Sequence, residues 1–330
     1  MHPPVFVHMT GIVLLVISVL LGGTAYTAER TRPIQIGALT ESWGPTPGIV
    51  GLRDGLLALG YREGEQFVLG VRFTQGDLAA LPAAARELVQ LGVDLLFASD
   101  VPAAKAAQLA TTQIPIVFMG LGGNPVEMGL IQSFAHPGGN STGVVNLAVD
   151  LGPKRLEMFR ELVPALHRVL FPYDPTDALS QAALRGYREA AHRLGLVLVE
   201  QPMRTLAEAQ ATLAQVRKGE VDGILQPPHI AWNIPGFIVE TAKQQGLPTM
   251  FDDVFWAERG GGLASYGPDT YASGQQAARL VDKILKGTQP AELPVETNAK
   301  IEFVINLKVA KALGLTINPV VLYQANRLIR

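Results

Sequence analysis

The sequence predicts an α/β protein with two doubly wound parallel-sheet lobes joined by a hinge. Short apolar runs rich in β-branched residues alternate with loops that contain Gly, Pro or Asp and with segments of helical periodicity. This alternation is typical of a parallel sheet covered by helices on both faces. It begins at Ile34 and begins again near Pro153, in a chain of 330 residues. Because domains usually contain about 100–200 residues, this length favours two of them.

The first series contains four expected strands and three expected helices. Gly60 is placed to end the first helix, and Pro82 suits the first turn of the second, because proline at that position loses no helical hydrogen bond. The expected strands are Ile34–Leu39, Phe67–Phe73, Val93–Ala98 and Ile114–Met119, and the expected helices are Ile49–Leu59, one beginning near Leu81, and Ala103–Ala110.

The second series repeats the pattern. Pro153 suits a helix start, Gly195 ends a later helix, and Thr205 with Glu208 forms a capping box before a third. The expected strands are Val169–Phe171, Val197–Val199, Val221–Leu225, Thr249–Phe251, Leu263–Tyr266 and Phe303–Ile305, and a long helix is expected over Asp269–Lys286.

An uncharged apolar run, Ile12–Leu21, precedes the first strand and is followed by Gly22-Gly23-Thr24-Ala25. About ten apolar residues suit the core of a secretory signal peptide, whereas a membrane-spanning helix needs roughly 20. We therefore expect residues 1–25 to be a signal peptide and the mature protein to be periplasmic. Retention of this segment as a membrane anchor is the alternative.

The chain contains no cysteine. A lipid-anchored export signal requires a cysteine at the cleavage point, so the protein is not expected to be a lipoprotein. Disulfides, thiolate metal sites and a thiol nucleophile are excluded as well.

The formal net charge is −2, without a basic cluster that could neutralise phosphates, so we expect no nucleic-acid partner.

One sequence pattern of a hydrolase is present. Gly139-Asn140-Ser141-Thr142-Gly143 matches G-x-S-x-G, which in a nucleophile elbow needs a strand before the serine and a helix after it. Here the turn His136-Pro137-Gly138 precedes the motif and strand-like Val144-Val145 follows it. The pattern is therefore interpreted as a turn that enters a crossing between the lobes, and no catalytic residue is expected.

Cofactor and metal sites are also not expected. Gly120-Leu121-Gly122-Gly123-Asn124 has neither the glycine spacing of a dinucleotide-binding loop nor the Gly-Lys-Ser/Thr ending of a P-loop. The four histidines outside the leader have no histidine or carboxylate partner at metal-binding spacing; they are His136, His167, His192 and His229.

Several segments between Ile34 and about Ile329 carry a resemblance to a known family. They are Gly55–Tyr61 with the Gly64 turn, Ile114–Phe118, Asn124–Ile131, Pro137–Val144, Lys154–Glu157 and Ile305–Leu315. Over nearly the whole mature chain, the sequence resembles the ABC transporter substrate-binding proteins, whose characterised members include binders of tryptophan and other aromatic amino acids.

This resemblance implies the type I periplasmic-binding fold and a periplasmic solute-binding component of an ABC importer. Such a protein captures a small organic molecule, such as an amino acid, between its lobes, closes by hinge bending and delivers it to the transmembrane permease. We expect a monomer with no cofactor. The expected lobes are 33–143 plus 264–293 and 146–261 plus 300–330, with crossings near Gly143–Leu147, Gly261–Tyr266 and Pro294–Ile301.

Ligands of open α/β sheets bind beyond the carboxyl ends of the strands, so candidate ligand-binding residues follow the expected strands. Trp43 is the strongest candidate, because it is a large apolar residue in a loop. Asp174 occupies a similar loop, with a plain turn role as the alternative, and His229 lies in a strand-end loop. The adjacent pair Asp252-Asp253 is placed to fix a ligand amine, with a solvated position as the alternative. The set of expected ligand-binding residues is Ser42, Trp43, Ser99, Asp100, Asn124, Tyr173, Gln226, Asp252 and Tyr266.

Two of these positions bear on the type of ligand. Ser99 and Asp100 precede a helix whose free N–H groups suit a ligand carboxylate. Where relatives often carry a Thr-Asp-Asn type loop, this chain has Gln226-Pro227-Pro228-His229, which removes polar groups that could hold an amino acid.

A periplasmic ligand sensor that presents its closed form to a signalling receptor is the alternative function, because it uses the same cleft.

The leader generates the first testable prediction. The mature protein should begin near Tyr26 and be released by osmotic shock, because the apolar run is too short to span a bilayer and no lipidation cysteine is present. Mass analysis of the N-terminus in the periplasmic fraction checks this. An intact N-terminus in the membrane fraction would contradict it.

Overall fold

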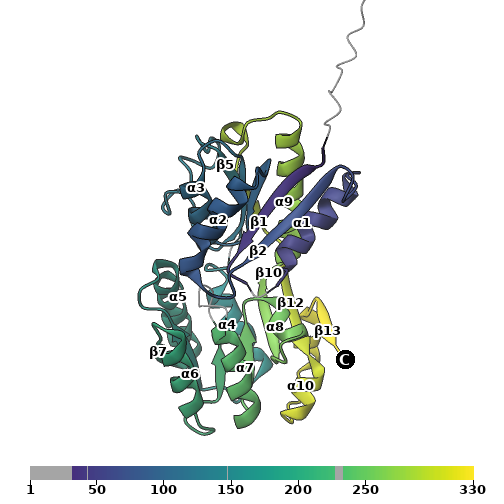
Figure 1. The fold of residues 1–330 in the computed structure, drawn as a ribbon. Coiled ribbons are helices and arrows are strands. Elements are labelled where there is room, and N and C mark those ends of the chain that lie inside the picture. The colour runs from purple at the N-terminus through teal and green to yellow at the C-terminus, as the bar shows by residue number, and fades with distance from the viewer. Residues whose placement is uncertain (1–31, 43, 147, 227–232) are drawn as a thin grey trace, which may run out of the picture. The chain divides into compact units, whose positions relative to one another are not determined.

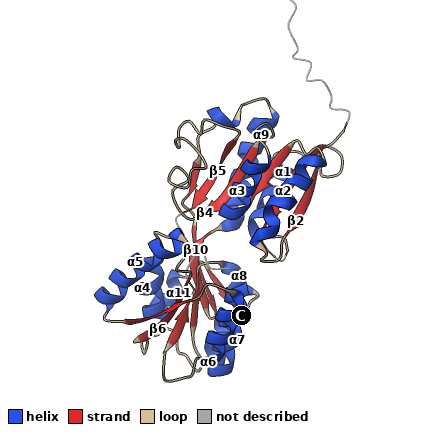
Figure 2. Cartoon of the chain, turned by 60° about the vertical axis from the view of Figure 1, so that its left-hand side comes forward, coloured by secondary structure: helices blue, strands red, loops and turns tan. Residues whose placement is uncertain are grey.

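The computed structural model describes residues 32–330, apart from 43, 147 and 227–232. Two mostly parallel sheets, each covered by helices, make up this part of the chain (Figures 1 and 2). The expected leader, residues 1–25, lies outside the described residues. The α/β fold class predicted from the sequence is confirmed.

The first sheet has six strands in the order β11-β5-β4-β3-β1-β2, and all its paired strands are parallel. The strands are β1 (Ile34–Thr40), β2 (Phe67–Phe73), β3 (Leu95–Ala98), β4 (Ile116–Leu121), β5 (Ser141–Asn146) and β11 (Glu296–Asn298). The helices that cover it are α1 (Pro47–Ala58), α2 (Leu81–Gln90), α3 (Val101–Ala110) and α9 (Thr270–Leu285).

The second sheet has seven strands in the order β13-β12-β10-β9-β8-β6-β7, with one antiparallel pair, β10 and β12. The strands are β6 (Arg168–Tyr173), β7 (Val197–Pro202), β8 (Gly223–Leu225), β9 (Thr249–Phe251), β10 (Ala264–Pro268), β12 (Ile301–Asn306) and β13 (Arg327–Ile329). The helices are α4 (Gly152–Leu162), α5 (Ala178–Leu194), α6 (Leu206–Gln215), α7 (Asn233–Gln245), α8 (Val254–Glu258), α10 (Leu307–Ala312) and α11 (Pro319–Gln324).

Each sheet has an apolar core on both faces. In β3, Leu95 and Phe97 pack into the core beneath α1 and α9, while Leu96 and Ala98 pack into the core beneath α2 and α3. Alternate side chains of a strand point to opposite faces, so a strand buried on both sides must be apolar throughout. This is why the near-continuous apolar runs of the sequence become central strands.

Several elements were not predicted from the sequence, or only in part. In β5 only Val144-Val145 was strand-like in the sequence; the strand begins earlier, at Ser141-Thr142-Gly143, which lacks an apolar pattern, and every residue of it is buried. The short elements α8, α10, α11, β11 and β13, together with α7, have too few periodic apolar residues to stand out. Their positions depend on packing against the central strands.

The chain passes between the sheets three times: between β5 and α4, between β10 and α9, and between β11 and β12. Two of these connections are hydrogen-bonded to each other. The Asp269 N–H donates to the Lys300 carbonyl at 2.9 Å, and the Asn298 side-chain amide donates to the Asp269 carbonyl at 2.8 Å. The third expected crossing, Pro294–Ile301, contains the observed connection between β11 and β12.

The other two crossings lie later in the chain than expected. β5 stays hydrogen-bonded in the first sheet as far as Asn146. Residues Gly261–Tyr266, the second expected crossing, belong to the second sheet, because β10 pairs with β9 and β12 there. The strand at 264–268 is thus part of the second sheet, whereas the expected boundary at residue 264 placed it in the first lobe. Pairing with a strand forty residues away is not visible in the local sequence.

A fully buried arginine joins the second sheet to the first crossing. The Arg155 guanidinium, from α4, donates to the hydroxyl of Tyr187 in α5 and to the carbonyls of Tyr266 in β10 and Ala148 after β5. Its exposed fraction is 0%. A buried charge is costly unless hydrogen bonds compensate it, so these contacts fix four segments around one side chain.

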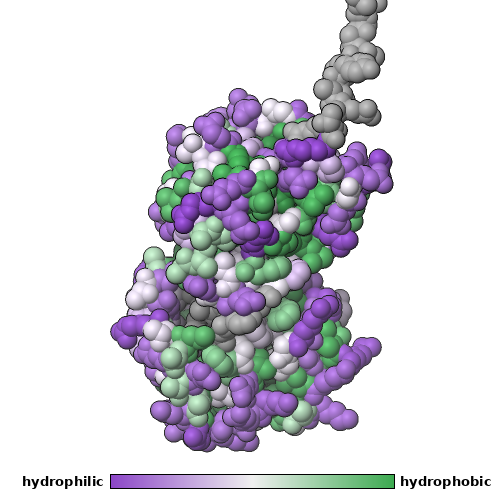
Figure 3. All heavy atoms as spheres, in the orientation of Figure 1, coloured by the Kyte–Doolittle hydropathy of each residue, from purple (hydrophilic) through white to green (hydrophobic). Residues whose placement is uncertain are grey.

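None of the helices in the described ranges combines the length and apolar character that crossing a bilayer requires. Both lobes mix hydrophilic and hydrophobic residues on the face shown in Figure 3.

Helices α1 and α9 lie side by side (Figure 1), and glycines allow their backbones to approach closely. A Cβ atom on Gly51 would lie 2.1 Å from the Tyr271 carbonyl oxygen, and one on Gly274 would lie 2.0 Å from the Gly48 carbonyl oxygen. Real Cβ atoms do not approach backbone oxygens this closely, so any larger residue would force the helices apart.

This contact predicts opposite effects for two glycine substitutions. Gly51→Ala should lower the free energy of unfolding by about 1–3 kcal/mol, because overpacking outweighs the better helix propensity of alanine. Gly186→Ala in α5 is the matched control: its Cβ would lie 3.8 Å from Pro153, so a gain of about 0.5–1 kcal/mol is expected. Denaturant unfolding of both variants measures the difference, and equal effects would contradict the close packing.

Candidate functional site

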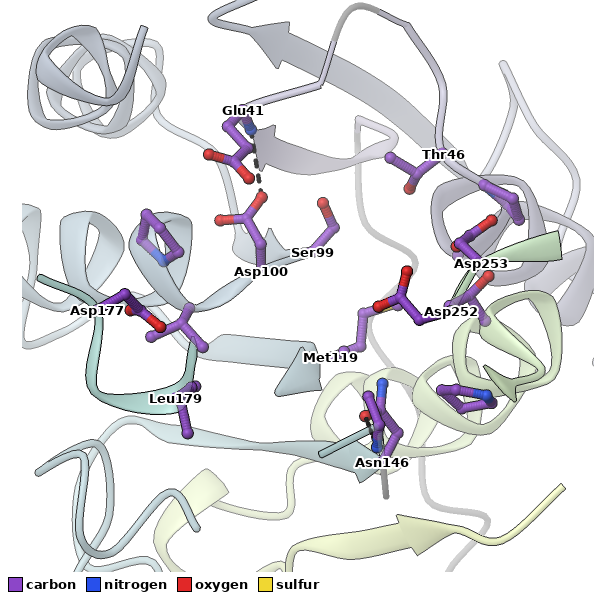
Figure 4. Close-up of a pocket in the computed structure, with 18 of the residues that line it drawn as sticks. Glu41, Thr46, Ser99, Asp100, Met119, Asn146, Asp177, Leu179, Asp252 and Asp253 are labelled. Atoms are coloured by element: carbon purple, nitrogen blue, oxygen red, sulfur yellow. Dashed lines mark hydrogen bonds between the residues drawn. The ribbon is translucent and has the colours of Figure 1, made fainter. Parts of the chain in front are cut away.

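A cleft of about 430 Å³ is lined by residues of both sheets (Figure 4). Its walls come from loops that follow the carboxyl ends of β1, β3, β4 and β5 in the first sheet and of β6, β8 and β9 in the second. Such strand ends are where ligands bind in open α/β sheets. The polar and charged lining residues are Glu41, Thr46, Ser99, Asp100, Lys105, Asn146, Asp174, Asp177, Gln226, Asp252, Asp253 and Thr270.

Four of the expected ligand-binding residues line this cleft: Ser99, Asp100, Gln226 and Asp252. Asp174 and Asp253, the further acidic candidates, line it as well. Trp43 and His229 lie outside the described residues.

The remaining four expected residues are not among the lining residues. Ser42 is buried, with its hydroxyl donating to the Gly44 carbonyl at 2.6 Å, and the Asn124 side-chain oxygen accepts from the Val126 N–H in a turn. Tyr173 and Tyr266 pack against the apolar core of the second sheet, Tyr266 with its ring 5.9 Å from that of Phe303. Asn124 therefore stabilises a turn, and the two tyrosines lie at the edge of the apolar core.

Sequence reasoning missed several lining residues. Glu41 and Thr46 flank the loop after β1, and Asn146 is the last residue of β5. The apolar lining includes Met119, Leu179 and Trp256. Trp256 belongs to the unpredicted helix α8, and its ring stacks on that of Phe251 with centroids 5.9 Å apart. Glu41 could have been identified as a candidate from its position directly after an apolar strand.

Two acidic residues of the first sheet lie close together in the cleft. The Glu41 N–H donates to a carboxylate oxygen of Asp100 at 3.2 Å, the bond drawn in Figure 4. Burial and the neighbouring Asp100 raise the pKa of Glu41, and burial raises the pKa of Asp100. Within the described part of the chain, no hydrogen bond or ion pair to the Glu41 carboxylate is found.

Asp100 also caps the helix that begins beside it. Its Oδ1 accepts from the Ala103 N–H at 2.7 Å in the first turn of α3. N-terminal helix N–H groups attract an anion, and here the protein's own carboxylate already occupies that position. The sequence predicted that these N–H groups suit a ligand carboxylate, and the structure shows Asp100 in that place.

The second sheet also contributes acidic residues to the cleft lining. Asp253 caps α8 through the Phe255 N–H at 2.8 Å, and burial raises its pKa to about 7. Asp177 caps α5 through the Ser180 N–H at 2.6 Å. Asp252 adjoins Asp253, and its N–H donates to the Gln226 side chain at 3.4 Å. In Figure 4 the carboxylates of Asp100 and Asp252 border the same space.

Two hydroxyl groups of the lining are buried and lack a hydrogen-bond partner among the described residues: Ser99 Oγ and Thr270 Oγ1. Buried polar atoms are nearly always paired with protein or water, so an unpaired one in a cleft marks a place for an additional donor or acceptor. No group of three or more histidine or acidic side chains that could hold a metal ion occurs in the described ranges.

The hydrolase motif does not form a nucleophile elbow. Ser141 begins β5, its exposed fraction is 2%, and its hydroxyl accepts from the Gln108 side-chain amide at 2.9 Å. The strand continues after the serine to Asn146, where a nucleophile elbow would require a helix, and the residue is not part of the cleft lining.

The chain matches the model of the family described as ABC transporter substrate binding protein over residues 42–329. It belongs to this family. The resemblance recognised in the sequence is thus confirmed, and the protein is an extracytoplasmic substrate-binding protein of the ABC transporter type, not an enzyme.

Individual relatives share the same fold. The chain is 26% identical over 291 residues to a tyrosine-binding protein of Clostridioides difficile, covering 87% of this chain and 82% of that protein. A conserved domain protein of Vibrio cholerae has 29% identity and a TM-score of 0.79 over 90% of this chain and 100% of its own. A Streptococcus pneumoniae domain solved with L-Trp has 24% identity and a TM-score of 0.77, with the same coverage.

The buried Glu41 carboxyl predicts an unusual pH dependence of stability. Because its pKa is raised on folding, the folded state retains a proton that the unfolded state releases, and the free energy of unfolding falls as pH rises above the ordinary carboxyl value. Glu41→Gln cannot ionise, so it should melt about 2–4 °C above the wild type at pH 8, or about 1 kcal/mol, and close to it at pH 4.5.

Calorimetry of ligand-free protein at both pH values measures this effect. Exposed Glu189 of α5 is the matched control, because Glu189→Gln makes the same chemical change away from the cleft lining. A Glu41→Gln variant that is less stable than the wild type at pH 8 would contradict the prediction.

Proposed function

We propose that this protein is the periplasmic solute-binding subunit of an ABC importer, which captures a small organic molecule in the cleft and delivers it to the permease. The observation that carries the proposal is the cleft itself, to which strand ends of both sheets contribute. Membership of the substrate-binding family supports the same role. The tyrosine-binding and L-Trp-bound relatives are compatible with a solute of amino-acid size.

The connections between the sheets support capture by hinge bending. Three short connections join the two sheets, and two of them are hydrogen-bonded together at Asp269. Lobes joined in this way can close on a solute by small backbone rotations at the connections. A permease then distinguishes the closed, loaded form from the open one. We propose that the protein acts as a monomer.

Loss of uptake is the expected consequence of deleting the gene. The solute is first identified by mass spectrometry of material released from the purified protein. Cells lacking the gene should then lose high-affinity uptake of the radiolabelled solute, and the wild-type gene should restore it. Unchanged uptake, with binding retained in vitro, would contradict the importer role and favour ligand sensing.

A further inference from the structure

We propose that the solute is an organic cation, an amine with an apolar body and no carboxylate group, rather than a zwitterionic amino acid. This inference rests on the proposed solute-binding function and names the chemical class of solute for the same cleft. Four observations carry it: the charge of the lining, the occupied helix terminus, the unpartnered polar groups and the apolar wall.

The charge of the cleft is strongly one-sided. Six carboxylates contribute to the lining described by the structure, against one basic side chain, that of Lys105. Lys105 is an exposed residue of α3. The nearby guanidinium of Arg155 is fully buried and donates to protein acceptors, so it is not accessible to a solute. Burial raises the pKa of Glu41, Asp100 and Asp253, so these acids hold protons more readily while the cleft is empty. A cation in the cleft favours their ionised form, whereas an anionic group disfavours it further.

The position that would hold a solute carboxylate is already occupied. At the start of α3, the Asp100 carboxylate accepts from the Ala103 N–H at 2.7 Å and from the Glu41 N–H at 3.2 Å. A second carboxylate placed there would lie beside Asp100 and Glu41, with like charges at short distance. An amine at the same place would instead meet acceptors.

Unpartnered polar groups lie next to that place. The Glu41 carboxylate has no partner among the described residues, and it is largely removed from water, which raises its pKa. Ser99 Oγ is buried and unpaired beside Asp100. In Figure 4 these three side chains project into the same part of the pocket. An ammonium group offers three donors and no acceptor. Its charge lowers the raised pKa of the Glu41 carboxyl, which releases its proton to solvent and then accepts from the ammonium beside Asp100 and Ser99 Oγ.

An apolar wall completes the site. Met119 of the first sheet and Leu179 and Trp256 of the second belong to the same lining as the acidic residues. Such a wall suits the hydrocarbon or aromatic part of an amine, because ligand pockets combine an apolar lining with a few polar groups that fix orientation. Small inorganic cations do not use this surface.

The test uses three probes with the same indole ring. Tryptamine carries only the amine, indole-3-propionate carries only the carboxylate, and L-tryptophan carries both. Binding of each is measured by isothermal titration on the mature chain, freed of bound solute by unfolding and refolding. We expect tryptamine to bind at least 10-fold more tightly than L-tryptophan and indole-3-propionate not to bind. Mass spectrometry of solute released from the untreated protein should find an amine without a carboxylate.

Variants locate the amine. Glu41→Gln should weaken tryptamine binding at least 10-fold while circular dichroism stays normal, because it removes a carboxylate that holds no other group. Glu189→Gln, the same chemical change on exposed α5, should leave binding unchanged. Asp100→Asn provides a second loss of charge at the same place, and its far-ultraviolet spectrum reports whether α3 remains folded.

The outcomes separate the two proposals. Tighter binding of L-tryptophan or indole-3-propionate, a carboxylate-bearing solute in the released material, or equal tryptamine affinity of Glu41→Gln and Glu189→Gln would overturn the cation inference and leave solute binding intact. A protein that binds none of the probes and releases no solute would overturn both.

Discussion

The buried guanidinium of Arg155 is the interaction on which the arrangement of the second lobe depends. It ties α4 to Tyr187 in α5, to the β10 backbone at Tyr266 and to the Ala148 carbonyl in the first crossing. A charge removed from water is stable only while these acceptors stay in place, so the four segments must keep one geometry. Because Ala148 also lines the cleft, the same contact positions one of its walls.

The cleft combines this fixed scaffold with polar groups that burial or a missing hydrogen-bond partner makes unfavourable while no solute is bound. Glu41 and Asp100 lie side by side with raised pKa values, and the Ser99 hydroxyl lacks a partner within the described residues. Functional sites commonly contain such unfavourable groups, because a ligand supplies the missing contacts. Stability of the empty protein and affinity for its solute are therefore expected to oppose each other at Glu41.

Much of the fold was predictable because it depends on local patterns. Continuous apolar runs such as Leu95–Ala98 indicate strands buried on both faces, and caps such as Asp100 and Thr205 mark helix starts. The beginning of β5 was missed because its small polar residues are buried through contacts with distant elements: the Thr142 hydroxyl donates to the Leu293 carbonyl at 2.8 Å. Contacts between residues so far apart in sequence leave no periodic signal.

The sequence by itself determined the fold class, the family and four cleft residues, Ser99, Asp100, Gln226 and Asp252, because strand ends are readable from apolar periodicity. Only the tertiary structure decided which strand-end side chains face the cleft. Ser42 turns inward while its neighbour Glu41 lines the cleft, and Tyr266 packs against the core. The direction of a loop side chain, and the sheet to which β10 belongs, depend on contacts with segments distant in sequence, which local residue patterns do not encode.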